Sequence, residues 1–213
     1  LNLQRLRLRN PLNIFEKRTV ALIPRNLVFE TPGRMRHDGT VKQPLDTVAL
    51  LTNVRAALDA GAVGIAVAFH HSYRNPAHEQ EAYDAIKAAY PDVNVTLSSS
   101  IWPKIGEYER AIVAVLNTYV KDRMFNYIQA IDTYLAGRLS NYKLFITRSN
   151  GGAMSAADAM AYPVHTLLSG PASGVTAAQF AGRNRADRKI VTLDMGGTST
   201  DISLIQDGKP IIS

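Results

Sequence analysis

Two aspartates and two glycines near the end of the chain have the types and spacing of a phosphate-binding turn. They lie in the segment Asp194-Met195-Gly196-Gly197-Thr198-Ser199-Thr200-Asp201. Because glycine has no Cβ, Gly196 and Gly197 allow positive φ and let backbone N–H groups approach a ligand. Thr198 and Thr200 add hydroxyl donors, so the turn can form a concavity for an anion. We therefore predict that Gly196, Gly197, Thr198 and Thr200 bind phosphate.

The aspartates at either end of this turn favour a metal-assisted site. Asp194 and Asp201 would repel a bare phosphate, but they suit a hydrated Mg²⁺ that bridges phosphate oxygens. We predict both as catalytic carboxylates, with Asp194 holding Mg²⁺ through water. The alternative is an ordinary hairpin, because glycine, threonine and aspartate are also common turn residues.

The elements on both sides must hold this turn in place. Val191 and Leu193 alternate with polar neighbours, as do Ile202 and Leu204, and this pattern predicts a strand before and after the turn. Upstream, residues 169–182 read as a helix, with Ser169 as cap, Pro171 in the first turn and Gly182 at the end. Small residues lie on nearly all faces of this helix, so other backbone segments can approach it closely, which suits a helix that connects two lobes. The alternative is an ordinary buried helix.

A second candidate loop is Ser149-Asn150-Gly151-Gly152. It follows a predicted strand over residues 142–147 and precedes a predicted helix over residues 155–161 that ends before Pro163. Loops between a strand and a helix often bind ligands in α/β folds. Ser149, Asn150 and Gly151 are therefore candidates for substrate or interlobe contacts, with a simple strand-to-helix turn as the alternative. Gly170, at the start of the predicted helix over residues 169–182, is a further candidate for such contacts.

The order of small-residue helix, strand, Asp-x-Gly-Gly-Thr turn and strand resembles the actin, sugar-kinase and heat-shock ATPase superfamily. A narrower resemblance is to the hydantoinase A and oxoprolinase family, and it extends from about Phe29 to the C-terminus. The segments that carry this resemblance are Ser72-Tyr73-Arg74-Asn75-Pro76-Ala77-His78-Glu79, Tyr108-Glu109-Arg110, Ser149-Asn150-Gly151-Gly152, Leu168-Ser169-Gly170-Pro171-Ala172 and the turn from Asp194 to Asp201.

This resemblance implies an α/β fold: a mixed, largely parallel sheet with flanking helices, as in a ribonuclease H-like or actin-like ATPase lobe, with one long helix and a C-terminal phosphate-binding β-hairpin. Residues 1–166 would be the remainder of a first lobe with a long helical insertion. Residues 167–213 would be the interlobe helix and the start of a second lobe. The first phosphate hairpin would lie upstream of Leu1 and the adenosine pocket beyond Ser213, so we expect the chain by itself to be inactive.

The activity implied by the resemblance is ATP-dependent opening of cyclic amides such as hydantoin or 5-oxoproline, through phosphoryl activation of a carbonyl oxygen. ATP and Mg²⁺ would be the cofactors, and a hydantoinase B-type subunit or fused domain the partner. An ATP-dependent ketone carboxylase subunit of the acetone type is one alternative. A non-catalytic nucleotide-sensing or assembly module is the alternative from another class.

Composition narrows the remaining functional classes. The net charge of +6 is concentrated in the first 36 residues, but no aromatic stacking set accompanies these arginines, so we expect a solvated or contact surface and no nucleic-acid binding. The longest apolar run, residues 60–69, is half of the ~20 residues that a membrane span needs. We expect no membrane association and a cytoplasmic location. The chain has no cysteine and no G-x-S-x-G segment, which excludes thiolate chemistry and disfavours a serine hydrolase.

The rest of the chain predicts alternating helices and strands. We expect strands over residues 27–30, 63–69 and 93–97, a hairpin turn at Asp38-Gly39, a helix through Val48, Leu51, Val54 and Leu58 that Gly61 ends, and a helix that Asn75 caps. A long helix over residues 104–135 follows, with a break near Lys121-Asp122 as an open alternative. His70, His71, His78 and Glu79 could bind zinc, but neighbouring histidines on a strand point to opposite faces, which favours loop-anchoring hydrogen bonds.

Overall fold

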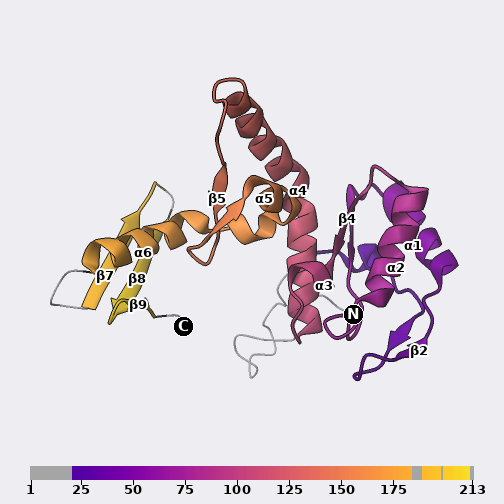
Figure 1. Cartoon of the computed structure of the whole chain (residues 1–213). Coiled ribbons are helices and arrows are strands. Elements are labelled where there is room, and N and C mark those ends of the chain that lie inside the picture. Colours follow the sequence, from indigo (N-terminus) through magenta and orange to yellow (C-terminus); the bar gives the residue numbers. More distant parts are fainter. Residues whose placement is uncertain (1–20, 184–188, 198, 212–213) are drawn as a thin grey trace. The chain divides into compact units, whose positions relative to one another are not determined.

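The computed structural model describes residues 21–183, 189–197 and 199–211 of the chain (Figure 1). The chain divides into two compact units, one up to Tyr119 and one from Val120 onward. Helices and strands alternate in both, so the expected mixed α/β class is confirmed.

The first unit is built around one short parallel sheet. Its elements are η1 (Arg25–Leu27), β1 (Arg34–Met35), β2 (Val41–Gln43), α1 (Thr47–Asp59), β3 (Gly64–Val67), α2 (Ala77–Ala89), β4 (Asn94–Leu97), α3 (Ser98–Ile101) and the start of α4 (Glu107–Ala136). Strands β3 and β4 pair in parallel, with Gly64 opposite Asn94 and Val67 opposite Leu97. The α2 helix makes the crossover between them.

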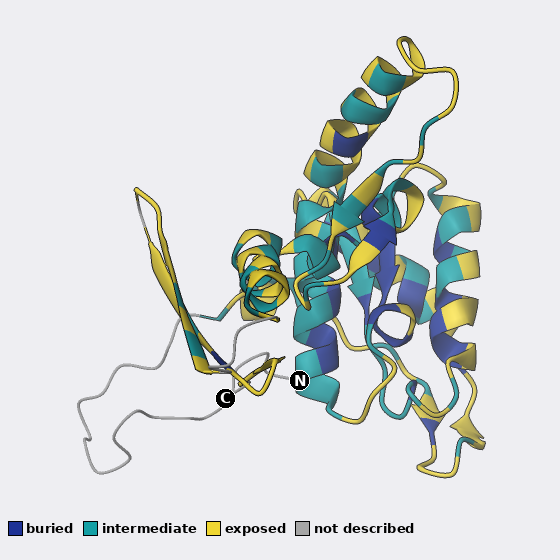
Figure 2. Ribbon diagram, turned by 60° about the vertical axis from the view of Figure 1, so that its left-hand side comes forward, coloured by how far each residue is buried: buried dark blue, intermediate teal, exposed yellow. Residues whose placement is uncertain are grey.

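The core of this unit lies between α1, α2 and the β3–β4 pair. Its buried members are Leu45, Leu50, Val54, Val67, Ala82, Ile86, Val95 and Leu97. The predicted α1 helix is confirmed, and Asp46 caps it by accepting a hydrogen bond from the Ala49 N–H at 2.9 Å. Its buried stripe differs from the expected one, because Leu50 and Ala57 face the core while Val48 is 76% exposed. Figure 2 shows buried residues concentrated in the helices and strands of this core.

Local structure explains three outcomes in the first unit. The expected strand at residues 27–30 is wrong: the 3₁₀ turn η1 ends at Leu27, and residues 28–30 form no strand. Arg25 donates to the Val28 carbonyl and pairs with Glu30. The turn at Asp38-Gly39 is confirmed, since Gly39 has φ +89° between β1 and β2. The expected cap at Asn75 is wrong by one residue: Pro76 is the N-cap of α2 and makes no side-chain cap bond, while Asn75 Oδ1 accepts from the N–H of Ala77, the first helical residue, at 3.0 Å.

The long predicted helix is confirmed as α4, whose 30 residues run without a break at Lys121-Asp122. At 1.5 Å per residue it is about 45 Å long. Its first part, in the first unit, lies against the sheet: Asn94 donates to the Thr118 carbonyl at 3.2 Å, and Asn117 donates to Thr96 at 3.4 Å.

The second unit contains the rest of α4 and two antiparallel sheets. Its elements are β5 (Phe145–Thr147), β6 (Ala153–Ser155), α5 (Ala156–Ala161), η2 (Pro163–Thr166), α6 (Ser169–Gly182), β7 (Lys189–Met195), β8 (Thr200–Gln206) and β9 (Lys209–Pro210). A small core of Ile128, Met154 and Ala159 joins α4, β6 and α5. Most of the β7–β8 hairpin is exposed (Figure 2).

The expected largely parallel sheet is wrong for the residues that the structure describes. Their strands form four separate sheets, and β3–β4 is the one parallel pair among them. The error has a physical cause: β5–β6 and β7–β8 are each joined by a short turn, and a short turn permits only antiparallel pairing. In the described ranges, the structure contains no helix that is long and apolar enough to cross a bilayer.

Candidate functional site

The Asp-x-Gly-Gly-Thr segment forms the predicted hairpin. Strands β7 and β8 pair over seven residues, and Asp194 lies directly opposite Asp201 at the end next to the turn. Both aspartates are exposed to solvent. The turn is therefore open, and the two carboxylates lie together at its base.

The two glycines of the turn do not have the backbone conformation that we expected. Neither Gly196 nor Gly197 has a left-handed φ, and a Cβ on Gly197 would meet no atom within 4 Å. The Gly196 N–H donates to the Ser199 carbonyl at 2.9 Å and closes the turn, so this N–H is already used. Thr198 lies outside the described residues. What the two glycines provide here is a surface without side chains, over which a ligand can approach the backbone.

The hairpin has two different faces, because side chains alternate along a strand. Asp194 and Asp201 share the face that is turned toward α6 with Ile190, Thr192, Ser203 and the buried Ile205. The outer face carries Val191, Leu193, Met195, Ile202 and Leu204, each at least 49% exposed. Thr200 pairs with Met195 and therefore belongs to the outer face. The structure thus brings the two aspartates together and leaves the Thr200 side chain on the other side.

Helix α6 lines the acidic face of the hairpin, and its small residues allow the close approach. A Cβ on Gly174 would lie 4.0 Å from Asp194 Oδ2, and a Cβ on Gly182 would overlap the Ile190 side chain. The groove between helix and hairpin has a volume of about 380 Å³ and includes Pro171, Gly174, Asp194 and Asp201. The helix bounds are confirmed, but Ser169 is not the cap: Leu168 precedes the helix with φ +61° and no side-chain cap bond.

The Ser149–Gly152 loop lies on the opposite face of α6. A Cβ on Gly151, which has φ +80°, would overlap Thr176 Oγ1 and lie 3.6 Å from the Ala172 carbonyl. Ala172 and Thr176 are about 160–200° around the helix from Gly174, since each residue turns it by about 100°. The structure therefore does not bring this loop to the paired aspartates.

The polar groups of that loop are engaged within the second unit. Ser149 donates through its hydroxyl to the carbonyls of His165 and Leu167, and Asn150 accepts from the Gly152 N–H at 3.2 Å. These bonds are those of an anchored turn. Gly170, in the first turn of α6, has no atom within 4 Å of an added Cβ and is open to solvent.

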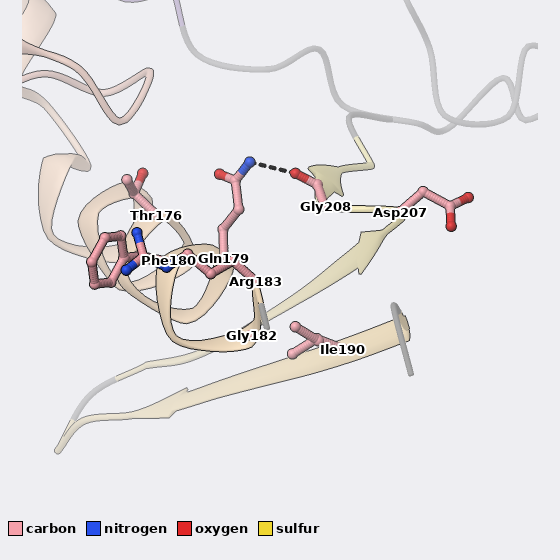
Figure 3. A pocket seen from close by; sticks show the side chains of 8 residues that line it. All are labelled: Thr176, Gln179, Phe180, Gly182, Arg183, Ile190, Asp207 and Gly208. Atoms are coloured by element: carbon pink, nitrogen blue, oxygen red, sulfur yellow. Dashed lines mark hydrogen bonds between the residues drawn. The ribbon is translucent and has the colours of Figure 1, made fainter. Parts of the chain in front are cut away.

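A second hollow lies at the C-terminal half of α6, beside the turn between β8 and β9 (Figure 3). Its volume is about 460 Å³. The Arg183 guanidinium stacks on Phe180 at 3.9 Å from the ring centre, and the Gln179 amide donates to the Gly208 carbonyl. It contains none of the predicted site residues, and Asp207 is the one carboxylate in its lining. This hollow lacks the paired acids of the hairpin groove.

The hairpin groove fits a hydrated magnesium ion better than a dehydrated metal. No group of three or more His, Cys, Asp or Glu side chains able to hold a metal occurs in the part of the chain that the structure describes. Mg²⁺ keeps several waters and commonly binds through one or two carboxylates together with substrate phosphates. Asp194 and Asp201 provide that donor set, whereas the histidine cluster at residues 70–78 does not provide a zinc site.

The contact between Gly174 and Asp194 was missed in reading the sequence. An alanine Cβ at this position would lie at ordinary contact distance from Asp194, so the glycine itself did not signal this neighbour. Thr192 and Ser203 were also missed, although the strand alternation places them beside the aspartates and they line the groove. The groove and the fold together define a mixed α/β protein whose acidic hairpin is backed by a small-residue helix.

Comparison with known proteins identifies the family. Residues 3–90 match the hydantoinase/oxoprolinase N-terminal region, and residues 110–213 match the hydantoinase/oxoprolinase model. The chain belongs to the hydantoinase/oxoprolinase family.

Individual relatives are similar over most of the chain. The alpha subunit of caprolactamase from Pseudomonas jessenii is 34% identical over 188 residues, which are 88% of this chain and 27% of that protein. The acetophenone carboxylase gamma subunit of Aromatoleum aromaticum is 32% identical over 89% of this chain and 26% of its own length. The nucleotide-free structure of acetone carboxylase superposes with a TM-score of 0.82 at 26% identity, over 91% of this chain and 28% of that one. The chain thus spans about a quarter of the length of these relatives.

Proposed function

We propose that the protein containing this chain is an ATP-dependent amidohydrolase that opens cyclic amides by phosphoryl activation of a carbonyl oxygen. The observation that carries the proposal is the opposed pair Asp194 and Asp201 on the acidic face of the hairpin, in a chain of the hydantoinase/oxoprolinase family. A caprolactamase subunit among the relatives supports a cyclic amide as substrate.

In this proposal the chain contributes half of a nucleotide site. Asp194 holds Mg²⁺ through water, Asp201 adds a second carboxylate, and the open surface of Gly196 and Gly197 admits the phosphates. Thr198 remains a proposed donor to phosphate, and Thr200 remains a proposed phosphate contact of the turn although its hydroxyl lies on the outer face. Ser149, Asn150, Gly151 and Gly170 remain proposed substrate or interlobe positions. Bound Mg²⁺ and ATP would supply charge neutralisation and the phosphoryl group.

The surrounding architecture is also a proposal. We place an actin-like ATPase lobe boundary between residues 166 and 167, so that α6 is the interlobe helix and the hairpin starts the second lobe. A partner subunit of the hydantoinase B type fits this arrangement, because the similar caprolactamase and acetophenone carboxylase chains are named as subunits.

A ketone carboxylase is the second candidate. The TM-score of 0.82 with acetone carboxylase and the similarity to an acetophenone carboxylase subunit favour it specifically. A lactam and a ketone both present a carbonyl oxygen for phosphorylation, so the hairpin alone serves either reaction.

The test is ATP hydrolysis by the full-length protein with its partner subunit. Stimulation by hydantoin, 5-oxoproline or caprolactam supports the amidohydrolase, and stimulation by acetone or acetophenone with bicarbonate supports the carboxylase. The Asp194→Asn variant should lose about 100-fold or more of the stimulated rate, because misplaced charge stabilisation commonly costs that much. Asp207→Asn is the matched control, since Asp207 is exposed in the β8–β9 turn and its φ of +51° suits asparagine. ATP binding without stimulation by any of these compounds would indicate the non-catalytic sensing or assembly module.

A further inference from the structure

The acidic face of the hairpin carries two hydroxyl side chains next to the paired aspartates. Thr192 of β7 lies directly opposite Ser203 of β8, and this pair is two residues further from the turn than the aspartate pair. Because side chains two residues apart share one face of a strand, both pairs lie on the side of the hairpin that α6 covers (Figure 1). The face therefore presents two carboxylates followed by two hydroxyls.

The rest of the groove between α6 and the hairpin is apolar. On the helix side its lining consists of small or aliphatic residues, namely Pro171, Gly174, Val175 and Ala178. The next pair on the same face of the hairpin is Ile190 opposite Ile205, and Ile205 is 2% exposed. A polar ligand that enters from the open turn therefore meets the carboxylates first, and the two hydroxyls are the last polar side chains before the groove closes.

The two carboxylates call for a cation. Asp194 and Asp201 lie directly opposite each other, and neither makes a hydrogen bond or an ion pair with its side chain among the residues that the structure describes. Like charges directly opposite on a sheet face destabilise it. A cation held at this face removes that repulsion.

The two hydroxyl oxygens are available as acceptors. Thr192 donates its proton to the Ser203 carbonyl at 3.4 Å, which leaves the lone pairs of its oxygen for a donor in the groove. The Ser203 hydroxyl has no hydrogen-bond partner in the described parts of the chain. A water molecule bound to a metal ion is such a donor.

The spacing of the two pairs suits an ion that keeps its water. Two residues along a strand span about 6.7 Å, so an ion midway between the pairs lies about 3.4 Å along the strand from each. Mg²⁺ holds its ligands at about 2.1 Å and keeps several waters, and each water donates over a further ~2.8 Å. The water shell can therefore reach both pairs at once, whereas direct coordination at about 2.1 Å cannot.

We propose that Thr192 and Ser203 are positioning residues that accept hydrogen bonds from the water shell of Mg²⁺ at the aspartate pair. The carboxylates hold the hydrated ion from the side of the turn, and the hydroxyls hold it from the closed side of the groove. This inference rests on the proposed ATP-dependent function, and it adds selectivity to that function. Ca²⁺ takes six to eight oxygen ligands directly, so a site that binds through water disfavours it.

The test measures metal binding by the full-length protein without turnover. Mn²⁺ serves as a paramagnetic probe in the presence of a non-hydrolysable ATP analogue, and electron paramagnetic resonance of the free Mn²⁺ gives the Kd. Ser203→Ala and the nearly isosteric Thr192→Val should each raise this Kd about 3- to 10-fold, because each removes one hydrogen bond to a bound water. Ser203→Thr keeps a hydroxyl and suits a strand, so its Kd should stay within about 2-fold of that of the unaltered protein.

Ser140→Ala is the matched control, since Ser140 is an exposed serine outside the hairpin. An unchanged Kd in both Ser203→Ala and Thr192→Val would overturn the role of the hydroxyls. An equal loss of affinity in Ser203→Thr would also overturn it, because the effect would then come from packing.

Failure of this inference is distinct from failure of the proposed function. If the unaltered protein binds the Mn²⁺–nucleotide complex and the hydroxyl variants bind it equally well, the ATP-dependent function stands and only the role of Thr192 and Ser203 is lost. If the unaltered protein binds no such complex, the proposed function fails, and the role of the hydroxyls fails with it.

Discussion

Replacing Glu79 by glutamine should destabilise the first unit severely although the two side chains have nearly the same shape. In either orientation, the glutamine amide directs its NH₂ group at a backbone N–H, that of Ser99 or that of Phe69. Each of these donors now reaches a carboxylate oxygen, at 2.8 and 2.9 Å. A serine hydroxyl can rotate to adapt, whereas a backbone N–H cannot.

The cost can be estimated from these contacts. One buried backbone donor without a partner costs about 1–3 kcal/mol. The remaining bonds lose their charge assistance, so the total should be about 2–4 kcal/mol. Ser99→Ala removes a single hydroxyl donor and should cost about 1.5 kcal/mol.

Urea unfolding of the chain followed by Trp102 fluorescence measures this effect locally. Trp102 is the one tryptophan of the sequence and directly follows α3, where its backbone N–H donates to the Ser98 carbonyl at 3.1 Å. Glu81→Gln on the same helix is the control, because Glu81 is exposed and surface changes usually stay within about 0.5 kcal/mol. If Glu79→Gln shifts the midpoint no more than Glu81→Gln does, Glu79 does not anchor the backbone at Phe69 and Ser99.

Three further outcomes follow from the described contacts. Gly151→Ala should destabilise the second unit by about 1–3 kcal/mol, because its φ is +80° and a Cβ would overlap Thr176 Oγ1; Gly137→Ala, without such a contact, is the comparison in thermal unfolding. Asn75→Ala should cost about 1–2 kcal/mol, since the bond from the Ala77 N–H to Asn75 Oδ1 and the bond from Asn75 Nδ2 to the Gly39 carbonyl at 2.8 Å are both lost. The folded-state pKa of His70 lies below 6.5, so the unfolded chain takes up the proton first and stability falls as the pH is lowered from about 7 through that folded pKa. His70→Gln should flatten this fall in urea midpoints between about pH 7 and pH 5, and an unchanged slope would contradict the argument.

The sequence predicted best where the chemistry is local. The hairpin from β7 to β8 and the unbroken pattern of α4 both depend on neighbours within one turn or one heptad. The opposition of Asp194 and Asp201 follows directly from a tight turn between alternating strands. These features need no information about distant parts of the chain.

Features that depend on long-range partners were predicted poorly. The strand expected at residues 27–30 has suitable residues, but in the described structure it pairs with no other strand, and Arg25 donates to the Val28 carbonyl and the Glu30 carboxylate instead. The separation of the Ser149 loop from the aspartates depends on which face of α6 each contacts, and periodicity alone does not fix that. Glu79 and Arg110 are likewise 31 positions apart in the sequence, and hydrogen bonds to the side chain of Ser98 connect them.

The outer face of the hairpin has a practical consequence for anyone handling this chain. Val191, Leu193 and Met195 on β7 are 61–71% exposed, and β7 is the edge of its sheet in the described structure. An exposed apolar edge strand is a template for pairing with another chain and a site of aggregation. The isolated polypeptide should therefore self-associate as its concentration rises. The surface responsible is the outer face of the hairpin, opposite to the face that carries the two aspartates.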